Sequence, residues 1–172
     1  ARRHDLPVRG YVSCAFGCPF EGAVAPAAVA RVTAALLAMG AYEVAVSDTI
    51  GVAHPGQVRA VMTALTGTLP RPQLALHFHD TRGMALPNVL AALSLGVSTF
   101  DASAGGLGGC PYAPGASGNL ATDDLLYMLD GLGIETGVSG AAIAEASAFI
   151  GGRIGHALAS RVAAAAASSP GA

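Results

Sequence analysis

Strand-like and helix-like stretches alternate four times along the chain, and this alternation limits the possible folds more than any other feature. The strand-like runs, rich in β-branched and aromatic residues, begin near residues 8, 42, 74 and 97. Apolar residues at helical spacing follow each run, and the first helix is expected to begin at Pro26 and to end at Gly40. Strands that alternate with helices form right-handed βαβ units, so we predict an α/β protein with a parallel sheet.

Two architectures fit such units, a doubly wound sheet and part of a (β/α)8 barrel, and both place active sites at the carboxyl ends of the strands. No Gly-x-Gly-x-x-Gly sequence follows the first strand, which weakens the case for a dinucleotide-binding fold. A complete barrel takes about 250 residues, whereas this chain has 172. We expect one domain with about four βα units over residues 8–133. A C-terminal helical segment should follow over 139–167, broken or bent around Gly151, Gly152 and Gly155.

The overall composition excludes several classes of protein. Hydrophobic residues make up 52% of the chain and charged residues 12%, with a net charge of −2, which suits a folded domain with a covered sheet. No basic run offers a surface to nucleic acid or to an anionic membrane, and no apolar run is long enough to cross a bilayer. No signal peptide opens the chain. We therefore expect a soluble, cytoplasmic protein.

The third strand-like run leads into two histidines and a carboxylate. Side chains alternate between the two faces of a strand, so His77 and His79 share one face while Phe78 takes the other. A rise of about 3.3 Å per residue separates the two histidine Cα atoms by roughly 6–7 Å, which allows both imidazoles to bind one metal ion. A strand that simply ends in polar residues would show the same pattern.

Other polar residues follow strand ends or lie in glycine-rich turns. Asn119 and Asp80 are further candidate ligands for a divalent ion such as Mg²⁺, Mn²⁺ or Zn²⁺, although a cap on the following turn suits Asp80 better. Asp48, which ends the second strand, could bind the metal or hold an imidazole in one tautomer. Cys110 lies among glycines, where a thiol is either a small buried residue or an acid or nucleophile facing a pocket.

Five blocks of sequence together resemble the hydroxymethylglutaryl-CoA lyases. The resemblance runs from about residue 8 to beyond residue 160, and the Gly-Gly-Cys-Pro-Tyr block is its most specific part. The His-x-His strand is shared with a wider superfamily of metal-dependent (β/α)8 enzymes that includes isopropylmalate synthase, homocitrate synthase and some aldolases. The blocks are Tyr11–Cys14 with Gly17–Gly22, Ser47–Gly51, His77–Thr81, Gly106–Ala113 and Gly118–Thr122.

The resemblance implies the second half of a (β/α)8 TIM barrel, followed by C-terminal helices. It implies a lyase that cleaves the acyl-CoA substrate 3-hydroxy-3-methylglutaryl-CoA to acetoacetate and acetyl-CoA, in leucine degradation and ketone-body metabolism. His77, His79 and Asn119 would be ligands of a divalent cation, Mg²⁺ or Mn²⁺, and His77 would also relay a proton. Cys110 would be the catalytic loop cysteine and Asp48 a catalytic carboxylate near the substrate. The alternatives are an acyl-CoA condensing synthase or aldolase of the same superfamily, or a non-catalytic assembly module.

One part of the family pattern has no match in this sequence. The family's first strand carries an Arg-Asp pair, in which the arginine supports the enolate and the aspartate is the remaining protein ligand of the metal. We therefore expect the first four βα units to be missing. Such a half barrel has two open sheet edges, which favours a homodimer or a separately encoded N-terminal half-barrel as partner. Alone, the chain is expected to be truncated and a poor catalyst.

Overall fold

The computed structural model describes residues 1–67, 69–109 and 118–168. Four parallel strands form one sheet in which neighbours in space are also neighbours in sequence. This order confirms the predicted βα alternation and is the order of adjacent strands in a (β/α)8 barrel. The strands are β1 (Arg9–Val12), β2 (Glu43–Asp48), β3 (Leu74–Phe78) and β4 (Thr99–Asp101).

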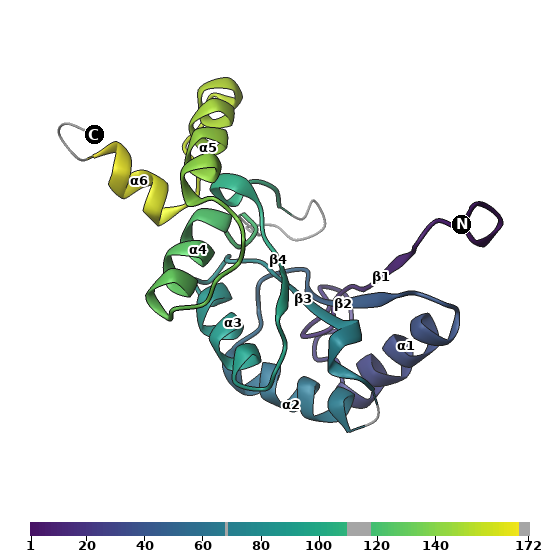
Figure 1. Ribbon diagram of the computed structural model, residues 1–172. Helices are drawn as coiled ribbons and strands as arrows, with labels where there is room; N and C mark the ends of the chain where they lie inside the picture. Colours follow the sequence, from purple (N-terminus) through teal and green to yellow (C-terminus); the bar gives the residue numbers. More distant parts are fainter. Residues whose placement is uncertain (68, 110–117, 169–172) are drawn as a thin grey trace.

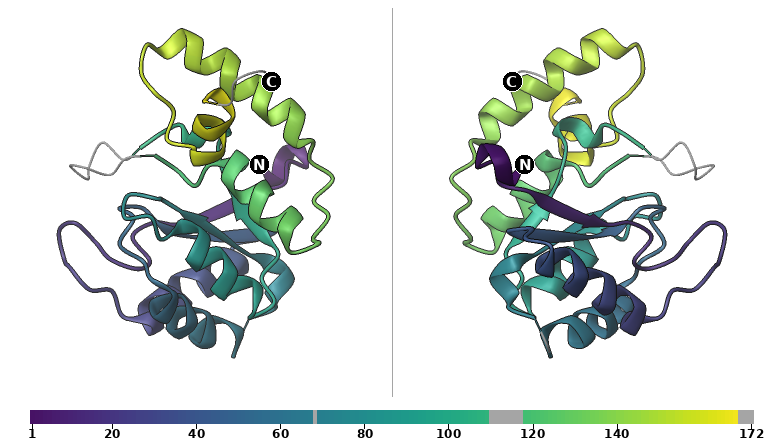
Figure 2. Two further views of the ribbon diagram at one scale, coloured as in Figure 1. Left: turned by 90° about the vertical axis from the view of Figure 1, so that its left-hand side faces the viewer. Right: turned by 90° about the vertical axis from the view of Figure 1, so that its right-hand side faces the viewer.

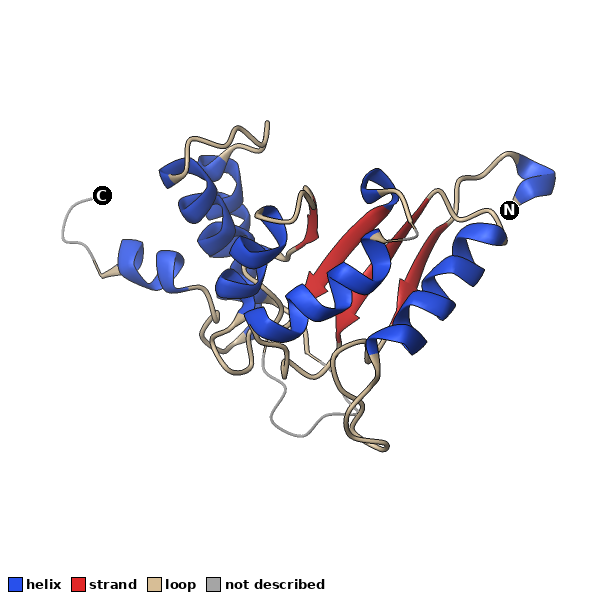
Figure 3. Ribbon diagram, turned by 90° about the horizontal axis from the view of Figure 1, so that it is seen from below, coloured by secondary structure: helices blue, strands red, loops and turns tan. Residues whose placement is uncertain are grey.

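Helices cover one face of this sheet (Figures 1 and 3). They are α1 (Pro26–Ala38), α2 (Pro55–Thr66) and α3 (Ala85–Leu93), and short 3₁₀ turns lie at η1 (Arg2–His4), η2 (Arg71–Gln73) and η3 (Ala104–Gly106). The helix-facing side chains of the strands form the core, with Val44, Val46, Leu74, Leu76 and Phe78 all at most 1% exposed. In the described part of the chain, no helix covers the opposite face, which is the side that faces the interior in a barrel.

Three helices follow the last strand: α4 (Thr122–Gly131), α5 (Gly140–Ile154) and α6 (Arg161–Ala167). In Figure 1, α5 and α6 lie beyond α4, away from β1, and Figure 2 shows these two helices at the end of the molecule opposite α1 and α2. The predicted break in the C-terminal helical segment falls at Gly155, which has a φ of 71° and ends α5. Gly151 and Gly152 lie inside α5, so the helix is not broken at those two glycines. No helix in the described ranges is long and apolar enough to span a membrane.

Candidate metal and catalytic site

Two histidines stand at the carboxyl end of β3, on the face that the helices leave open. The ring centroids of His77 and His79 are 5.3 Å apart, which confirms that the two side chains share one face. Phe78 lies on the other face, where its ring packs 5.9 Å from that of Phe16. His79 is buried, whereas a quarter of the His77 side chain is exposed. Strand alternation alone explains this arrangement.

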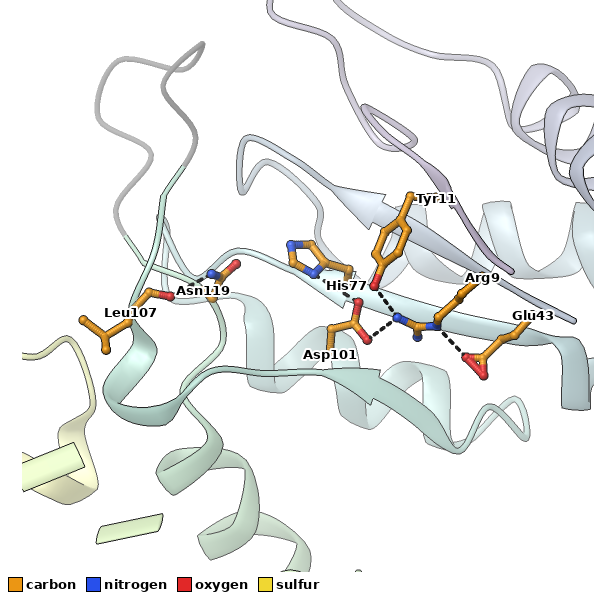
Figure 4. Close-up of polar contacts among 7 residues, drawn as sticks. All are labelled: Arg9, Tyr11, Glu43, His77, Asp101, Leu107 and Asn119. Atoms are coloured by element: carbon orange, nitrogen blue, oxygen red, sulfur yellow. Dashed lines mark hydrogen bonds and ion pairs between the residues drawn. The ribbon is translucent and has the colours of Figure 1, made fainter. Parts of the chain in front are cut away.

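Asn119 comes from a distant part of the sequence and lies beside His79. Residues 118–120 pair with the end of β3, because the N–H of Leu120 donates to the carbonyl of Phe78 at 3.0 Å and an antiparallel bridge joins His79 to Asn119. The Asn119 amide Nδ2 donates to the carbonyl of Leu107 at 2.8 Å, which fixes the orientation of its side chain (Figure 4). The structure therefore brings together the three residues predicted as metal ligands.

The donor atoms of these residues fit a divalent cation. Nδ1 of His79 and Oδ1 of Asn119 are buried and have no hydrogen-bond partner among the described residues. A buried polar atom without a partner costs about 1–3 kcal/mol, a cost that a bound ion or its water would remove. Two imidazoles with an amide oxygen suit a divalent first-row metal or Mg²⁺. Within the described ranges, no group of three or more His, Cys, Asp or Glu residues forms a metal site by itself.

Asp48 lies on the other face of the sheet from the two histidines, together with Val44 and Val46. Its two carboxylate oxygens each accept a backbone N–H at 2.9 Å, from Val52 and Ala53, so that it braces the turn after β2. The pKa of Asp48 is raised by burial, and these backbone donors offset only part of that effect. The structure does not bring this carboxylate to the imidazoles, so its position argues against a role as metal ligand or tautomer holder.

Asp80 follows His79 and adopts the capping role that the sequence favoured. Its Oδ1 accepts the N–H of Ala85 at 2.8 Å, at the start of α3, and its Oδ2 pairs with Arg161 at 3.0 Å. The hydrogen bond from Arg161 to Asp80, together with the negative charge of Asp80, raises the pKa of Arg161. A cavity of about 400 Å³ opens here, lined by Asp80, Arg82, Asn119 and Arg161 among others. Both oxygens of Asp80 are thus engaged away from the histidines.

A network of charged side chains covers the open face beside His77 (Figure 4). Arg9 donates from Nε to Glu43 at 2.9 Å and from Nη1 to Asp101 at 2.8 Å. The other oxygen of Asp101 lies 3.3 Å from Nδ1 of His77. Tyr11 contacts Arg9 through its hydroxyl and meets the His77 ring edge-on, with centroids 6.5 Å apart. Sequence reasoning missed the four residues that surround His77 in this network.

The network shifts the pKa values of its members in opposite directions. Burial raises the pKa of Asp101, but hydrogen bonding and charge from His77 and Arg9 outweigh it, so that the net pKa is lowered. Burial lowers the pKa of Arg9, and its two carboxylate partners more than reverse that change. The pKa of Tyr11 is raised, mainly by burial and then by Asp101. Burial, and then the neighbouring His77, lower the pKa of His79. At neutral pH the site therefore holds a neutral His79 and an ionised Asp101.

Two of the three cysteines lie in the described part of the chain. Cys14 and Cys18 line a cavity of about 290 Å³ together with Tyr11. Cys14 has a φ of 58°, a left-handed conformation that non-glycine residues seldom adopt outside constrained loops, and its N–H donates to Oγ1 of Thr49 at 2.8 Å. Cys110, the predicted loop acid, lies outside the described residues, so its role stays a prediction.

The parallel order of the strands, the helices on one face and the polar site at the carboxyl ends define part of an α/β barrel of the TIM type. The chain belongs to the HMGL-like family, whose model matches residues 4–150. It is 57% identical to mitochondrial hydroxymethylglutaryl-CoA lyase of Bos taurus over 150 residues, 87% of this chain and 46% of the relative. It is 51% identical to cytoplasmic 3-hydroxy-3-methylglutaryl-CoA lyase of Mus musculus, again over 87% of this chain and 44% of the relative.

A solved structure agrees with these sequence relatives. The HMG-CoA lyase of Bacillus subtilis superposes with a TM-score of 0.94 at 47% identity, over 98% of this chain and 56% of that chain. The chain thus spans about half the length of the relatives that it matches. This likeness bears out the predicted family and the predicted partial barrel.

Proposed function

We propose that the polypeptide carrying this chain is a divalent-metal-dependent carbon–carbon lyase that cleaves 3-hydroxy-3-methylglutaryl-CoA to acetoacetate and acetyl-CoA. The observation that carries the proposal is the convergence of His77, His79 and Asn119 at the carboxyl end of β3, with a buried nitrogen and a buried oxygen free of partners among the described residues. The names of the relatives supply the reaction class and the substrate.

The metal would be held by the two imidazoles and the Asn119 amide oxygen, with Mg²⁺ or Mn²⁺ as the proposed ion. A cation bound there supplies a Lewis acid that makes the tertiary hydroxyl of the substrate easier to ionise. Because a quarter of its side chain is exposed while His79 is buried, His77 is proposed as the ligand that faces the substrate hydroxyl, whose proton would leave to water. His79 and Asn119 would then hold the ion without exchanging protons.

The rest of the reaction requires a proton donor on the opposite side of the breaking bond. When the bond between the substrate's C2 and C3 breaks, its electron pair remains on the carbon next to the thioester, and that carbon must receive a proton. We propose the Cys110 thiol as this donor, since a thiol has a pKa near 8.5 that its surroundings readily lower. Asp48 is proposed as a positioning residue that fixes the turn at Val52 and Ala53, because both its oxygens bind that turn.

The assembly of a complete site is part of the proposal. β1 and β4 are the two edges of the described sheet, and each leaves backbone groups open to a further strand. We propose that the other strands of a barrel cover these edges, supplied by the same polypeptide, by a second copy of the chain or by a separately encoded half-barrel. The isolated 172-residue chain is then expected to turn over slowly.

The test is an assay of the intact polypeptide on 3-hydroxy-3-methylglutaryl-CoA with Mg²⁺ or Mn²⁺, together with a titration of Mn²⁺ binding. We expect His79→Ala to weaken Mn²⁺ binding and Cys110→Ala to keep it while lowering kcat by about 10²–10⁴-fold. His4→Ala is the matched control, because His4 is exposed and lies before the amino end of β1.

Three outcomes would contradict the proposal. Cleavage that survives Cys110→Ala at the normal rate would remove the proposed acid. Condensation of an acyl-CoA without any cleavage would favour a synthase of the same superfamily. Mn²⁺ binding that His79→Ala leaves unchanged would place the metal elsewhere and favour a non-catalytic module.

A further inference from the structure

We propose that Asp101 is a positioning residue for His77: its carboxylate keeps the proton of the neutral imidazole on Nδ1, so that Nε2 remains unprotonated and available to a divalent cation. The last step of this inference rests on the proposed function. The first step, the fixed tautomer, rests only on contacts within this chain and can be tested without metal.

The sheet register places the two residues next to each other. His77 of β3 is the direct partner of Asp101 of β4, and parallel neighbours in register project from the same face about 4.8 Å apart. The contact is specific to one ring nitrogen, since Oδ2 of Asp101 lies 3.3 Å from the buried Nδ1 of His77, an ion-pair distance whose angles are not those of a well-aligned hydrogen bond. An ionised carboxylate only accepts hydrogen bonds, so the nitrogen that faces it is the one that carries hydrogen.

The carboxylate is itself held from the other side. Its second oxygen accepts a hydrogen bond from Nη1 of Arg9 at 2.8 Å, and Arg9 is held in turn by Glu43 at 2.9 Å (Figure 4). Arg9 and Glu43 are also register partners, on β1 and β2. Side chains from β1 and β2 therefore fix the direction of the Asp101 side chain, which leaves it little freedom to turn away from the imidazole.

The two histidines differ in how they are held. His79 is 6% exposed and, unlike His77, forms no ion pair with a carboxylate among the described residues. Burial orients the His79 ring, whereas a carboxylate and the edge-on Tyr11 ring orient that of His77. The network of one guanidinium and two carboxylates carries a formal charge of −1 beside His77. That charge favours a cation on the open face, in addition to fixing the tautomer.

Substitution of Asp101 by asparagine should reverse the tautomer. Arg9 offers only N–H groups, so the amide oxygen of the new side chain would turn toward Arg9, and its NH₂ group would face Nδ1 of His77. Nδ1 must then accept, and the imidazole proton moves to Nε2. Glu43→Gln is the matched control, because it removes the same charge from the same network at a residue that does not touch His77.

The experiment measures ¹⁵N shifts of the imidazole nitrogens in the metal-free intact polypeptide, with a His77→Gln variant to assign the signal. We expect the Nδ1–H tautomer in the wild type and in Glu43→Gln, and the Nε2–H tautomer in Asp101→Asn. Mn²⁺ affinity should fall about 10–100-fold in Asp101→Asn and less than about threefold in Glu43→Gln. Circular dichroism and thermal unfolding confirm that the variants fold, and the wild-type tautomer provides a test that needs no variant.

An Nε2–H tautomer in the wild type would overturn the inference, and so would equal losses of affinity in Asp101→Asn and Glu43→Gln. Failure of the proposed function would look different. If the wild-type polypeptide did not bind Mn²⁺, or if His79→Ala bound it normally, the metal site would be wrong. The metal-free tautomer would then decide whether Asp101 positions His77.

Discussion

Asp124 in α4 provides a sharp test of what holds the C-terminal helices against the barrel strands. Its buried carboxylate accepts three hydrogen bonds from the start of α6: from Ser160 Oγ at 2.7 Å, from the Val162 N–H at 2.9 Å and from the Arg161 N–H at 3.1 Å. α6 has seven residues and none of them is buried. The helix is therefore held by polar contacts at its first turn rather than by an apolar interface.

The loss of stability expected for α6 in Asp124→Ala follows from these hydrogen bonds. Hydrogen bonds to a charged group contribute about 1.5–3 kcal/mol each, and a helix shorter than about 12 residues is marginal on its own. Asp124→Ala should release α6 locally instead of unfolding the core, and the released N–H groups regain water. We expect the free energy of local opening to fall by about 2–4 kcal/mol, less than the sum of three bonds.

Hydrogen exchange followed by mass spectrometry measures this change. Amides of residues 161–167 should exchange about 30–1000-fold faster in Asp124→Ala, since about 1.4 kcal/mol corresponds to a factor of ten. Amides of β2 and β3 should exchange as in the wild type. Asp130→Ala is the control, because Asp130 is an exposed carboxylate on the same helix. Unchanged exchange over 161–167, or equal effects of the two variants, would refute the reasoning.

Three further predictions follow from single contacts. Gly108→Ala should weaken Mn²⁺ binding about tenfold in a calorimetric titration, because a Cβ at this φ of 99° would lie 2.5 Å from the Asn119 amide nitrogen. Gly133→Ala is the control, because Gly133 also has a positive φ, of 70°, but a Cβ there would meet no atom within 4 Å, so Mn²⁺ binding should not change. Phe78→Ala should lower the urea-derived free energy of unfolding by about 3–5 kcal/mol, since the side chain is fully buried. The pKa of His79 is lowered in the folded chain from the usual histidine value of 6.5, so the unfolded chain binds more protons as the pH falls through that value. Stability of the metal-free protein should therefore fall as pH drops from about 7 toward about 5, with a shallower slope in His79→Gln, as thermal unfolding at each pH would show.

The fold was largely predictable because its signals are local. Strand and helix periodicities identified four βα units, and strand alternation placed His77, Phe78 and His79 on their observed faces. The same rule applied to β2 would have placed Asp48 on the helix side with Val44 and Val46, so its location could have been found. A carboxylate at a strand end indicates the site edge only when the alternation along the whole strand also points it to the open face.

The network around His77 could not be predicted in the same way. Asp101 meets His77 only because β3 and β4 pair in one particular register, and Arg9 reaches Asp101 across 92 positions of sequence. The hydrophobic pattern excludes a slip of one residue, which would turn the core side chains outward, but a slip of two residues keeps every side chain on its face. The continuity of α5 at Gly151 is a similar case, because Leu158, from outside that helix, packs against this glycine.

The segment that leads into α6 also lies close to the proposed metal site, next to Asn119. The N–H of Ala159 donates to the carbonyl of Gly105 at 3.0 Å, and a Cβ on Gly118 would lie 3.3 Å from the Ala159 methyl group. Gly118 precedes Asn119, whose side chain is the proposed oxygen ligand. Release of α6 would loosen Ala159 and the turn at Gly118 together. Asp124→Ala should therefore weaken Mn²⁺ binding although Asp124 is not a ligand, and unchanged affinity in a variant with faster α6 exchange would show that the two regions are independent.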